Sequence, residues 1–90
     1  MNDPDQEKLL VFPCEFPIKV MGRDSEQFRQ TAIALVEEHA GKVLDDAIKT
    51  SASSKGNFLS ITVTITATSQ EQLDNIYQAL SDHDEILVAL

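Results

Sequence analysis

Cysteine and histidine, the residues that most often bind metals, are few and far apart in this sequence. Cys14 is the single cysteine, and the histidines His39 and His83 fall on or after different predicted helices. Soft metal ions are held by paired thiolates or imidazoles at short spacing, so the sequence predicts no metal site. We expect Cys14 to pack as a small hydrophobic residue and His39 to lie at the end of a helix.

Acidic residues occur in three adjacent pairs, which are Glu37-Glu38, Asp45-Asp46 and Asp84-Glu85. Paired carboxylates can share general acid and base roles. Neighbouring residues on a helix point in different directions, however, and acidic runs are usually solvated. Because no nucleophile, base and orienting group occur together, the sequence predicts no catalytic residues and no enzyme.

Two short segments have residue types that bind anions. Gly22 and Arg23 could form a ligand loop like the glycine-rich, arginine-containing loop with which acylphosphatases bind phosphate. Asp24 places negative charge where such an anion would sit, which argues against phosphoryl chemistry.

The second segment consists of Ser53, Ser54, Lys55, Gly56 and Asn57. It can be a plain hairpin turn, because all of these are good turn formers or polar. It can also be an interaction loop, in which Lys55, nearby hydroxyls and a free backbone amide contact an anionic group. Both interpretations stay open at this stage.

Composition limits the partners and the location. The 90 residues include 7 Lys and Arg against 15 Asp and Glu, for a formal net charge of -8 and a pI near 4.4. Nucleic acids and anionic membranes attract positive charge, so neither is expected as a partner. One cysteine, no signal peptide and no apolar run of about 18 residues indicate a cytoplasmic protein. We expect a disordered acidic tail at 1–8 and a single domain at 9–90.

Hydrophobic spacing predicts the elements of the first half of the chain. Alternating apolar residues predict a strand at Phe16–Met21. A helix is predicted at Ser25–Ala40, begun by Asp24 with Gln27 as a capping box and ended by Gly41.

The second half begins with Val43–Ala52, an edge strand without clean alternation that leads into a hairpin tip at Thr50–Asn57. Leu59–Ala67 alternates strictly between aliphatic residues and Ser or Thr, which is typical of a half-buried strand. Thr68 or Ser69 begins a second helix, with Glu71 or Gln72 completing its capping box. The apolar stripe of this helix is Leu73, Ile76, Tyr77 and Leu80.

A final strand is predicted at Glu85–Leu90. Both of its faces are apolar, with Ile86, Val88 and Leu90 on one side and Leu87 and Ala89 on the other. Such an edge needs a cover, which we expect from the Leu9–Phe12 arm or from a second copy of the chain.

The order strand, helix, strand, strand, helix, strand predicts a ferredoxin-like α+β sandwich. Its antiparallel sheet would have the strand order 4-1-3-2, with both helices on one face. The side chains expected to face the helices are Ile18, Val20, Phe28, Leu35, Ile61, Val63, Ile65, Leu73, Ile76 and Leu80. The opposite face of the Leu59–Ala67 strand would have only hydroxyl side chains, so RNA bases would find no aromatic to stack on. It would be a solvated face, a polar ligand floor or a partner surface.

Five segments together resemble a known family. They are Leu9-Leu10 with Phe12-Pro13, Lys19-Val20-Met21-Gly22, His39-Ala40, Ser53-Ser54-Lys55-Gly56-Asn57-Phe58 and Ile65-Thr66-Ala67-Thr68. On these residues the chain, from about Leu9 to Leu90, resembles the YbeD-like family of small bacterial proteins of unknown function. The resemblance implies a fold similar to the ACT regulatory domain, which in other proteins binds amino acids at the loop after its first strand. It implies no catalytic residue, and Arg23-Asp24-Ser25 departs from the ACT ligand pattern.

We therefore expect a small cytoplasmic module with a regulatory or protein-interaction role, no catalytic activity and no cofactor. Its working surface would be a sheet edge or the open sheet face. The alternative is a sensing domain that binds an amino acid or carboxylate at a dimer interface, through Gly22 and its neighbours. The candidate partners are a second copy of the chain and an unidentified protein.

Overall fold

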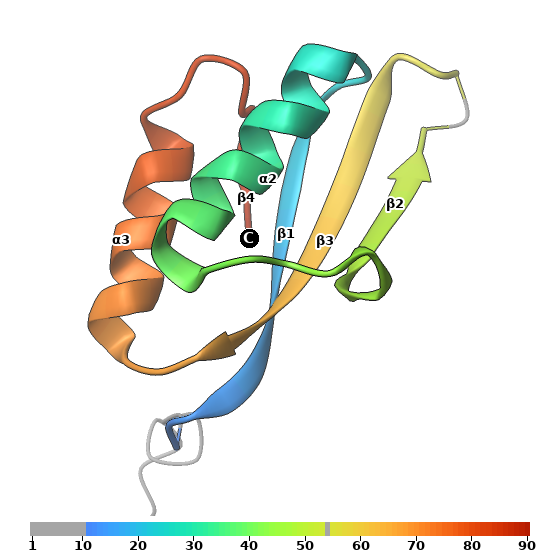
Figure 1. Cartoon of the computed structure of the whole chain (residues 1–90). Helices are drawn as coiled ribbons and strands as arrows, with labels where there is room; N and C mark the ends of the chain where they lie inside the picture. Colours follow the sequence, from blue (N-terminus) through green and yellow to red (C-terminus); the bar gives the residue numbers. More distant parts are fainter. Residues whose placement is uncertain (1–10, 54) are drawn as a thin grey trace, which may run out of the picture.

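The computed structural model describes residues 11–53 and 55–90 (Figure 1). The predicted tail at 1–8 and Ser54 lie outside the described residues. The helices and strands of the described chain are β1 (Cys14–Arg23), α2 (Glu26–Ala40), a 3₁₀ turn (Asp45–Ala47), β2 (Ile48–Ala52), β3 (Phe58–Ala67), α3 (Gln70–Ser81) and β4 (Val88–Ala89). Within the described part, no helix is long and apolar enough to cross a bilayer.

The four strands form one antiparallel sheet in the order β2-β3-β1-β4, which is the predicted order read from the other edge. The central pair, β1 and β3, is in register over ten residues, from Cys14 opposite Ala67 to Arg23 opposite Phe58. Both helices lie side by side over one face of this sheet (Figure 1). The ferredoxin-like α+β fold is therefore confirmed, and no helix of the described residues lies on the other face of the sheet.

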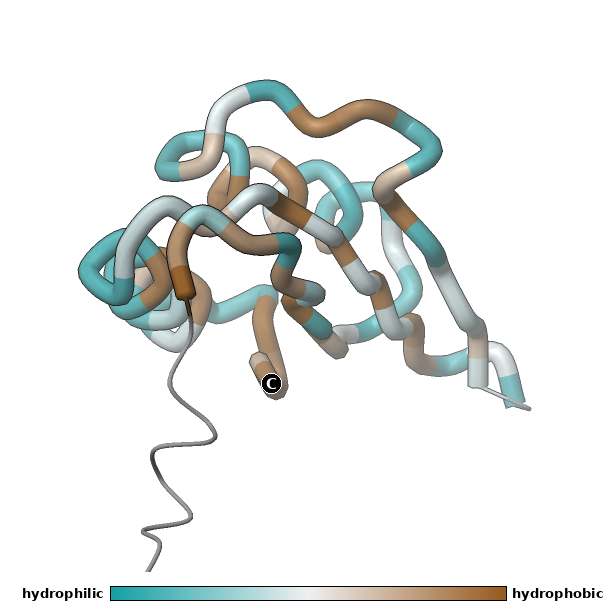
Figure 2. The backbone as a smooth tube through the Cα atoms, turned by 90° about the horizontal axis from the view of Figure 1, so that it is seen from below, coloured by the Kyte–Doolittle hydropathy of each residue, from teal (hydrophilic) through white to brown (hydrophobic). Residues whose placement is uncertain are grey.

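The core lies between the sheet and the helices. Every residue predicted for it is buried except Leu35, which is half-buried and packs against the core. On β3, buried aliphatic residues alternate with half-buried or exposed Ser and Thr, and hydrophobic and polar colours alternate along the strands in Figure 2. Period-two alternation thus decides which face of the sheet meets the helices.

The start of α2 differs from the prediction. Ser25, not Asp24, is the N-cap, and its hydroxyl accepts a hydrogen bond of 3.0 Å from the Phe28 amide. Asp24 instead accepts from the Arg29 guanidinium at 2.8 Å. Both residues are good caps, so residue type alone did not distinguish them. Gly41 ends the helix as predicted, at a positive φ of 83°.

The start of α3 follows one of the two predicted alternatives. Ser69 is the N-cap, and its hydroxyl accepts from the Gln72 amide at 3.0 Å. The Gln72 side-chain oxygen accepts from the Thr68 amide at 2.7 Å, one residue earlier than a capping box requires.

The first three strands are shifted at their ends. β1 and β3 are longer than predicted, so that Arg23 and Phe58 are paired strand residues. β2 runs to Ala52, so Thr50–Ala52 belongs to the strand and the hairpin tip is confined to 53–57. Pairing with β3 defines β2, because all its residues except Ile48 are exposed and leave no burial pattern in the sequence.

The predicted final strand is wrong in length and in facing. β4 consists of Val88 and Ala89 alone. Ile86 is buried in the core, whereas Val88 lies opposite Met21 on the other face of the sheet. The Ile86 amide donates to the His83 carbonyl at 3.1 Å in a turn that ends at Ile86, and a bend at Leu87 breaks the alternation before β4 begins. Of the arm expected to cover this edge, Leu9 and Leu10 lie outside the described residues.

Candidate functional site

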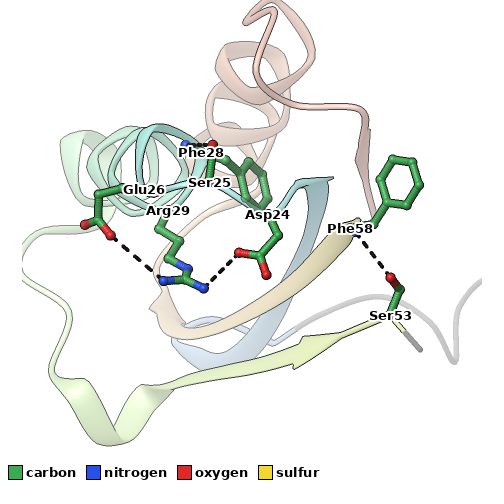
Figure 3. Close-up of polar contacts among 7 residues, drawn as sticks. All are labelled: Asp24, Ser25, Glu26, Phe28, Arg29, Ser53 and Phe58. Atoms are coloured by element: carbon green, nitrogen blue, oxygen red, sulfur yellow. Dashed lines mark hydrogen bonds and ion pairs between the residues drawn. The ribbon is translucent and has the colours of Figure 1, made fainter. Parts of the chain in front are cut away.

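The two segments that the sequence singled out meet at one end of the sheet. Arg23 lies opposite Phe58 in the β1–β3 ladder, and the Asp24 amide donates to the Asn57 carbonyl at 3.1 Å. Figure 3 shows the start of α2 beside the Ser53 and Phe58 pair. The predicted ligand loop and the predicted interaction loop are therefore neighbours.

Gly22 allows two elements to pack closely. It is buried, and a Cβ built on it would lie 2.5 Å from the Phe28 ring and 2.7 Å from the Glu85 carbonyl oxygen. Protein atoms fill the helix side of this position. A ligand in this region would have to contact the opposite side of the sheet, where the Arg23 side chain lies.

Arg23 and Phe58 form a pair on that opposite side. The guanidinium carbon lies 5.6 Å from the centroid of the Phe58 ring, in cation–π range, and Phe58 is 39% exposed. Sequence reasoning missed this exposed aromatic because it began the strand at Leu59. The sequence did contain a signal for it, because Phe58 is the last residue of the segment 53–58, which is one of the five that resemble the YbeD-like family.

The hairpin tip has the bonds of a structural turn. Ser53 accepts from the Phe58 amide through its hydroxyl at 3.2 Å and donates its own amide to the Phe58 carbonyl at 2.9 Å. The Gly56 amide donates to the Ser53 carbonyl at 2.9 Å, and Gly56 has a positive φ of 75°. The Gly56 amide is thus engaged within the turn, whereas Lys55 is an exposed cation.

The N-terminus of α2 is occupied by its own chain. Arg29 contacts Asp24 at 2.8 Å and Glu26 at 3.9 Å (Figure 3). The Ser25 hydroxyl already accepts from the Phe28 amide. The Phe28 amide is thus used within the chain, and the acidic side chains of Asp24 and Glu26 lie where a helix N-terminus would bind an external anion.

The side of the sheet away from the helices, called the open face below, is organised in cross-strand rows. Directly paired residues point to the same side, so the register assigns each row. The three rows nearest the hairpin tip are Ser53, Phe58 and Arg23; then Ser51, Ser60, Met21 and Val88; then Lys49, Thr62, Lys19 and Leu90.

A hollow of about 140 Å³, called the open-face depression below, lies in the first two rows. Its lining combines an aromatic ring, a thioether and serine hydroxyls. The lining residues with side chains on the open face are Met21, Ser51, Ser53, Phe58 and Ser60. Arg23 lies in the row of Phe58, and Lys19 and Lys49 lie in the next row along the strands.

Charge is distributed unevenly between the two sides of the molecule. Of 15 acidic residues, Asp3, Asp5 and Glu7 lie outside the described part, and of the other twelve only Glu15 belongs to a strand, where the register puts it on the open face. Of 7 cations, Lys8 lies outside the described part. The open-face cations are Lys19, Arg23 and Lys49. Both ion pairs among the described residues belong to Arg29, so the open-face cations have no acidic partner there.

The residues considered for metal or acid chemistry lie apart. Cys14 is half-buried against the core, and His39 is exposed in the last turn of α2. His83 accepts from the Glu85 amide through Nδ1 at 3.1 Å, and Glu37 accepts from the Val43 amide at 2.9 Å. Within the described ranges, no three His, Cys, Asp or Glu residues are grouped as metal ligands would be.

Tyr77 lies on α3 and is half-buried. Partial burial raises the pKa of its phenol, because a desolvated phenolate is less stable than one in water. The hydroxyl donates to the Leu90 carbonyl at 2.7 Å. Tyr77 therefore holds the end of the chain and lies away from the open-face depression.

Comparison with known proteins identifies the family. A family model described as a protein of unknown function, DUF493, matches residues 7–90. The chain belongs to the DUF493 family. The UPF0250 protein of Paraburkholderia phytofirmans is 44% identical over 84 residues, covering 93% of this chain and 94% of the relative. The UPF0250 protein of Janthinobacterium is 48% identical over 84 residues, covering 93% and 92%. The resemblance to the YbeD-like family is confirmed.

Two solved structures are similar to this member of the DUF493 family. The solution structure of protein HP0495 from H. pylori has a TM-score of 0.64 at 18% identity, and the match covers 91% of this chain and 86% of that one. The uncharacterized protein TM1266 from Thermotoga maritima has a TM-score of 0.61 at 10% identity, with 84% and 92% covered. At these identities the likeness concerns the fold alone.

Proposed function

We propose that this protein is a non-catalytic, cytoplasmic protein-interaction module with a regulatory role, and that its working surface is the open face. One observation carries the proposal. In a chain of net charge -8, the described strands place three cations and one acid on the side of the sheet away from the helices. The unpaired Cys14 supports a reducing compartment.

Protection of the sheet edge does not account for this distribution. A lysine on an edge strand blocks unwanted strand pairing, which would explain Lys49 on β2. Lys19 lies on the central strand β1, and both its amide and its carbonyl are bonded to Leu90, so its own backbone is not an unpaired edge. A cation there is best explained by a partner that approaches the sheet face.

Site-specific photo-cross-linking in cells tests this proposal. A photoreactive amino acid would replace Thr62, at the centre of the open face, and as matched control Gln30, exposed on α2. We expect a discrete cross-linked protein from position 62 and none from position 30. Equal cross-linking from both positions, or none from position 62, would contradict the proposal. Lys55→Glu, combined with the photoreactive residue at position 62, reports whether the hairpin tip takes part. A weaker cross-link than in the protein with native Lys55 would show that it does.

A second candidate function is recognition of a small carboxylate or amino acid at a dimer interface. The open-face depression favours it, because serine hydroxyls and Arg23 could together bind a carboxylate. Thermal-shift measurements with amino acids and dicarboxylates at millimolar concentration test it, with sedimentation to detect a ligand-dependent dimer. A rise in Tm of several degrees that Arg23→Gln abolishes would support sensing, and an unchanged Tm would exclude it.

A further inference from the structure

We infer that the open face binds an acidic peptide segment of a partner protein in an extended conformation. Its carboxylates would contact Lys19, Lys49 and Arg23, and one apolar side chain would enter the open-face depression. This inference rests on the proposed function and adds to it the chemistry of the partner.

The cations are spaced as an extended acidic segment requires. Lys19 and Lys49 flank Thr62 in one cross-strand row, so their backbones are about 10 Å apart. Arg23 lies four residues from Lys19 on β1, about 13 Å along the strand. A segment of about five extended residues covers this distance. Glu15, the one described acid on this face, lies four residues from Lys19 in the other direction and outside this area.

The area between the cations is apolar enough to hold an anchor. Met21, which is half-buried, and Phe58, which is 39% exposed, both line the open-face depression. Val88, 41% exposed, continues the apolar surface beside Met21. Interfaces commonly combine an apolar centre with charged residues at the rim, and this surface has that arrangement.

A second copy of the chain fits this face less well. In a two-fold symmetric dimer the same patch meets itself, so Lys19, Lys49 and Arg23 would face the same cations of the other copy. Like charges brought together oppose association. A copy that offered its acidic helices instead would form a head-to-tail contact, which generates open filaments unless the rotation closes.

A nucleic acid also fits less well, despite the cations. Single-stranded binding relies on several aromatic platforms on which successive bases stack, and Phe58 is the one aromatic that the described strands place on the open face. Backbone phosphates require many neutralising contacts, whereas this face has three cations on an acidic chain. A short acidic segment of a protein needs fewer neutralising cations than a nucleic-acid backbone does.

NMR titration of the isotope-labelled protein provides the test. The probe is a synthetic peptide of about ten residues, with a central Leu-Phe pair flanked by Glu and Asp. The matched control peptide has Gln and Asn in place of the acids. We expect saturable shift changes at Lys19, Met21, Lys49, Phe58 and Thr62 with the acidic peptide alone, weakened by added salt.

Protein variants then separate specific binding from general charge attraction. Lys49→Glu should weaken peptide binding about tenfold. The matched control Lys42→Glu makes the same charge change outside the strands and away from the three rows that hold Lys19, Lys49 and Arg23, and should change affinity by less than about twofold. Equal losses in the two variants, or shift changes centred on the helices, would overturn the inference.

Three further outcomes would overturn it as well. They are equal binding of the Gln and Asn peptide, tighter binding of a single-stranded oligonucleotide, and self-association through the open face detected by sedimentation. Failure here is distinguishable from failure of the proposed function. If position 62 cross-links to a partner whose contacting segment is neutral or basic, the interaction function stands and the acidic-segment inference falls.

Discussion

The two faces of β3 differ although their residues alternate along one strand. Ile61, Val63 and the other odd-numbered residues from Leu59 to Ala67 are buried under the helices. Thr62, Thr64 and the other hydroxyl residues face away and stay partly exposed. Burial under the helices stabilises the fold, at about 25 cal/mol for each Å² of apolar surface removed from water. The open face contributes little of this and can vary in composition without unfolding the domain.

Gly22→Ala should produce the largest loss of stability, because it adds a methyl group on the covered side. The new Cβ would lie 2.5 Å from the Phe28 ring and 2.7 Å from a backbone oxygen, and we expect the free energy of unfolding to fall by about 3 kcal/mol or more. Urea melts measure it. Gly56→Ala is the control: it has open space but a positive φ, and should cost about 1 kcal/mol. Equal losses would refute the packing role of Gly22.

Val63→Ala and Thr64→Ala compare the two faces directly. Val63 is fully buried, so its truncation should lower the free energy of unfolding by about 2 kcal/mol through lost burial and a cavity. Thr64 points to the open face, and its truncation should cost less than about 0.5 kcal/mol. Similar losses in urea melts would show that the open face is covered in solution.

Ser25→Ala should cost about 1 kcal/mol, because it removes the hydroxyl that accepts from the Phe28 amide. Asp24→Ala removes a partly exposed ion pair with Arg29 and should cost about 0.5 kcal/mol or less. Thermal melts of the two variants decide which residue caps α2. A larger loss for Asp24→Ala would restore the cap that the sequence predicted.

Tyr77 should produce the smallest effect, visible only at high pH. Burial raises the pKa of its phenol in the folded state, so the unfolded chain loses this proton first as the pH rises. Ionisation of Tyr77 should therefore leave the free energy of unfolding unchanged below the ordinary tyrosine pKa of about 10, and should lower it as the pH rises above that value. Urea melts across that range, compared with Tyr77→Phe, isolate the contribution. Parallel curves for the two proteins would exclude it.

Long alternating segments were predictable, and weakly patterned edges were not. The residues of Leu59–Ala67 alternate because one side is buried against helices, so the pattern identifies strand and facing together. β2 has a single half-buried residue, Ile48, so its bounds depend on pairing with β3. The turn that ends at Ile86 and the bend at Leu87 inverted the predicted facing of the last segment, since such local backbone geometry is not reported by hydrophobicity.

Both candidate loops were predictable as segments, but their proximity was not. Gly22-Arg23 and the hairpin tip have residue types that stand out locally. Their proximity follows from the register that pairs Arg23 with Phe58 and from the bond between the Asp24 amide and Asn57. Ladder register is a property of two strands together.

The sequence by itself determined the order of the elements, the face of each long strand that is buried, and the family. These follow from hydrophobic period and residue type, which act along short stretches of chain. Only the tertiary structure decided that Lys19, Arg23 and Lys49 gather on one face around the open-face depression. They come from two strands that are separated in the sheet by β3, and cross-strand pairing brings them together.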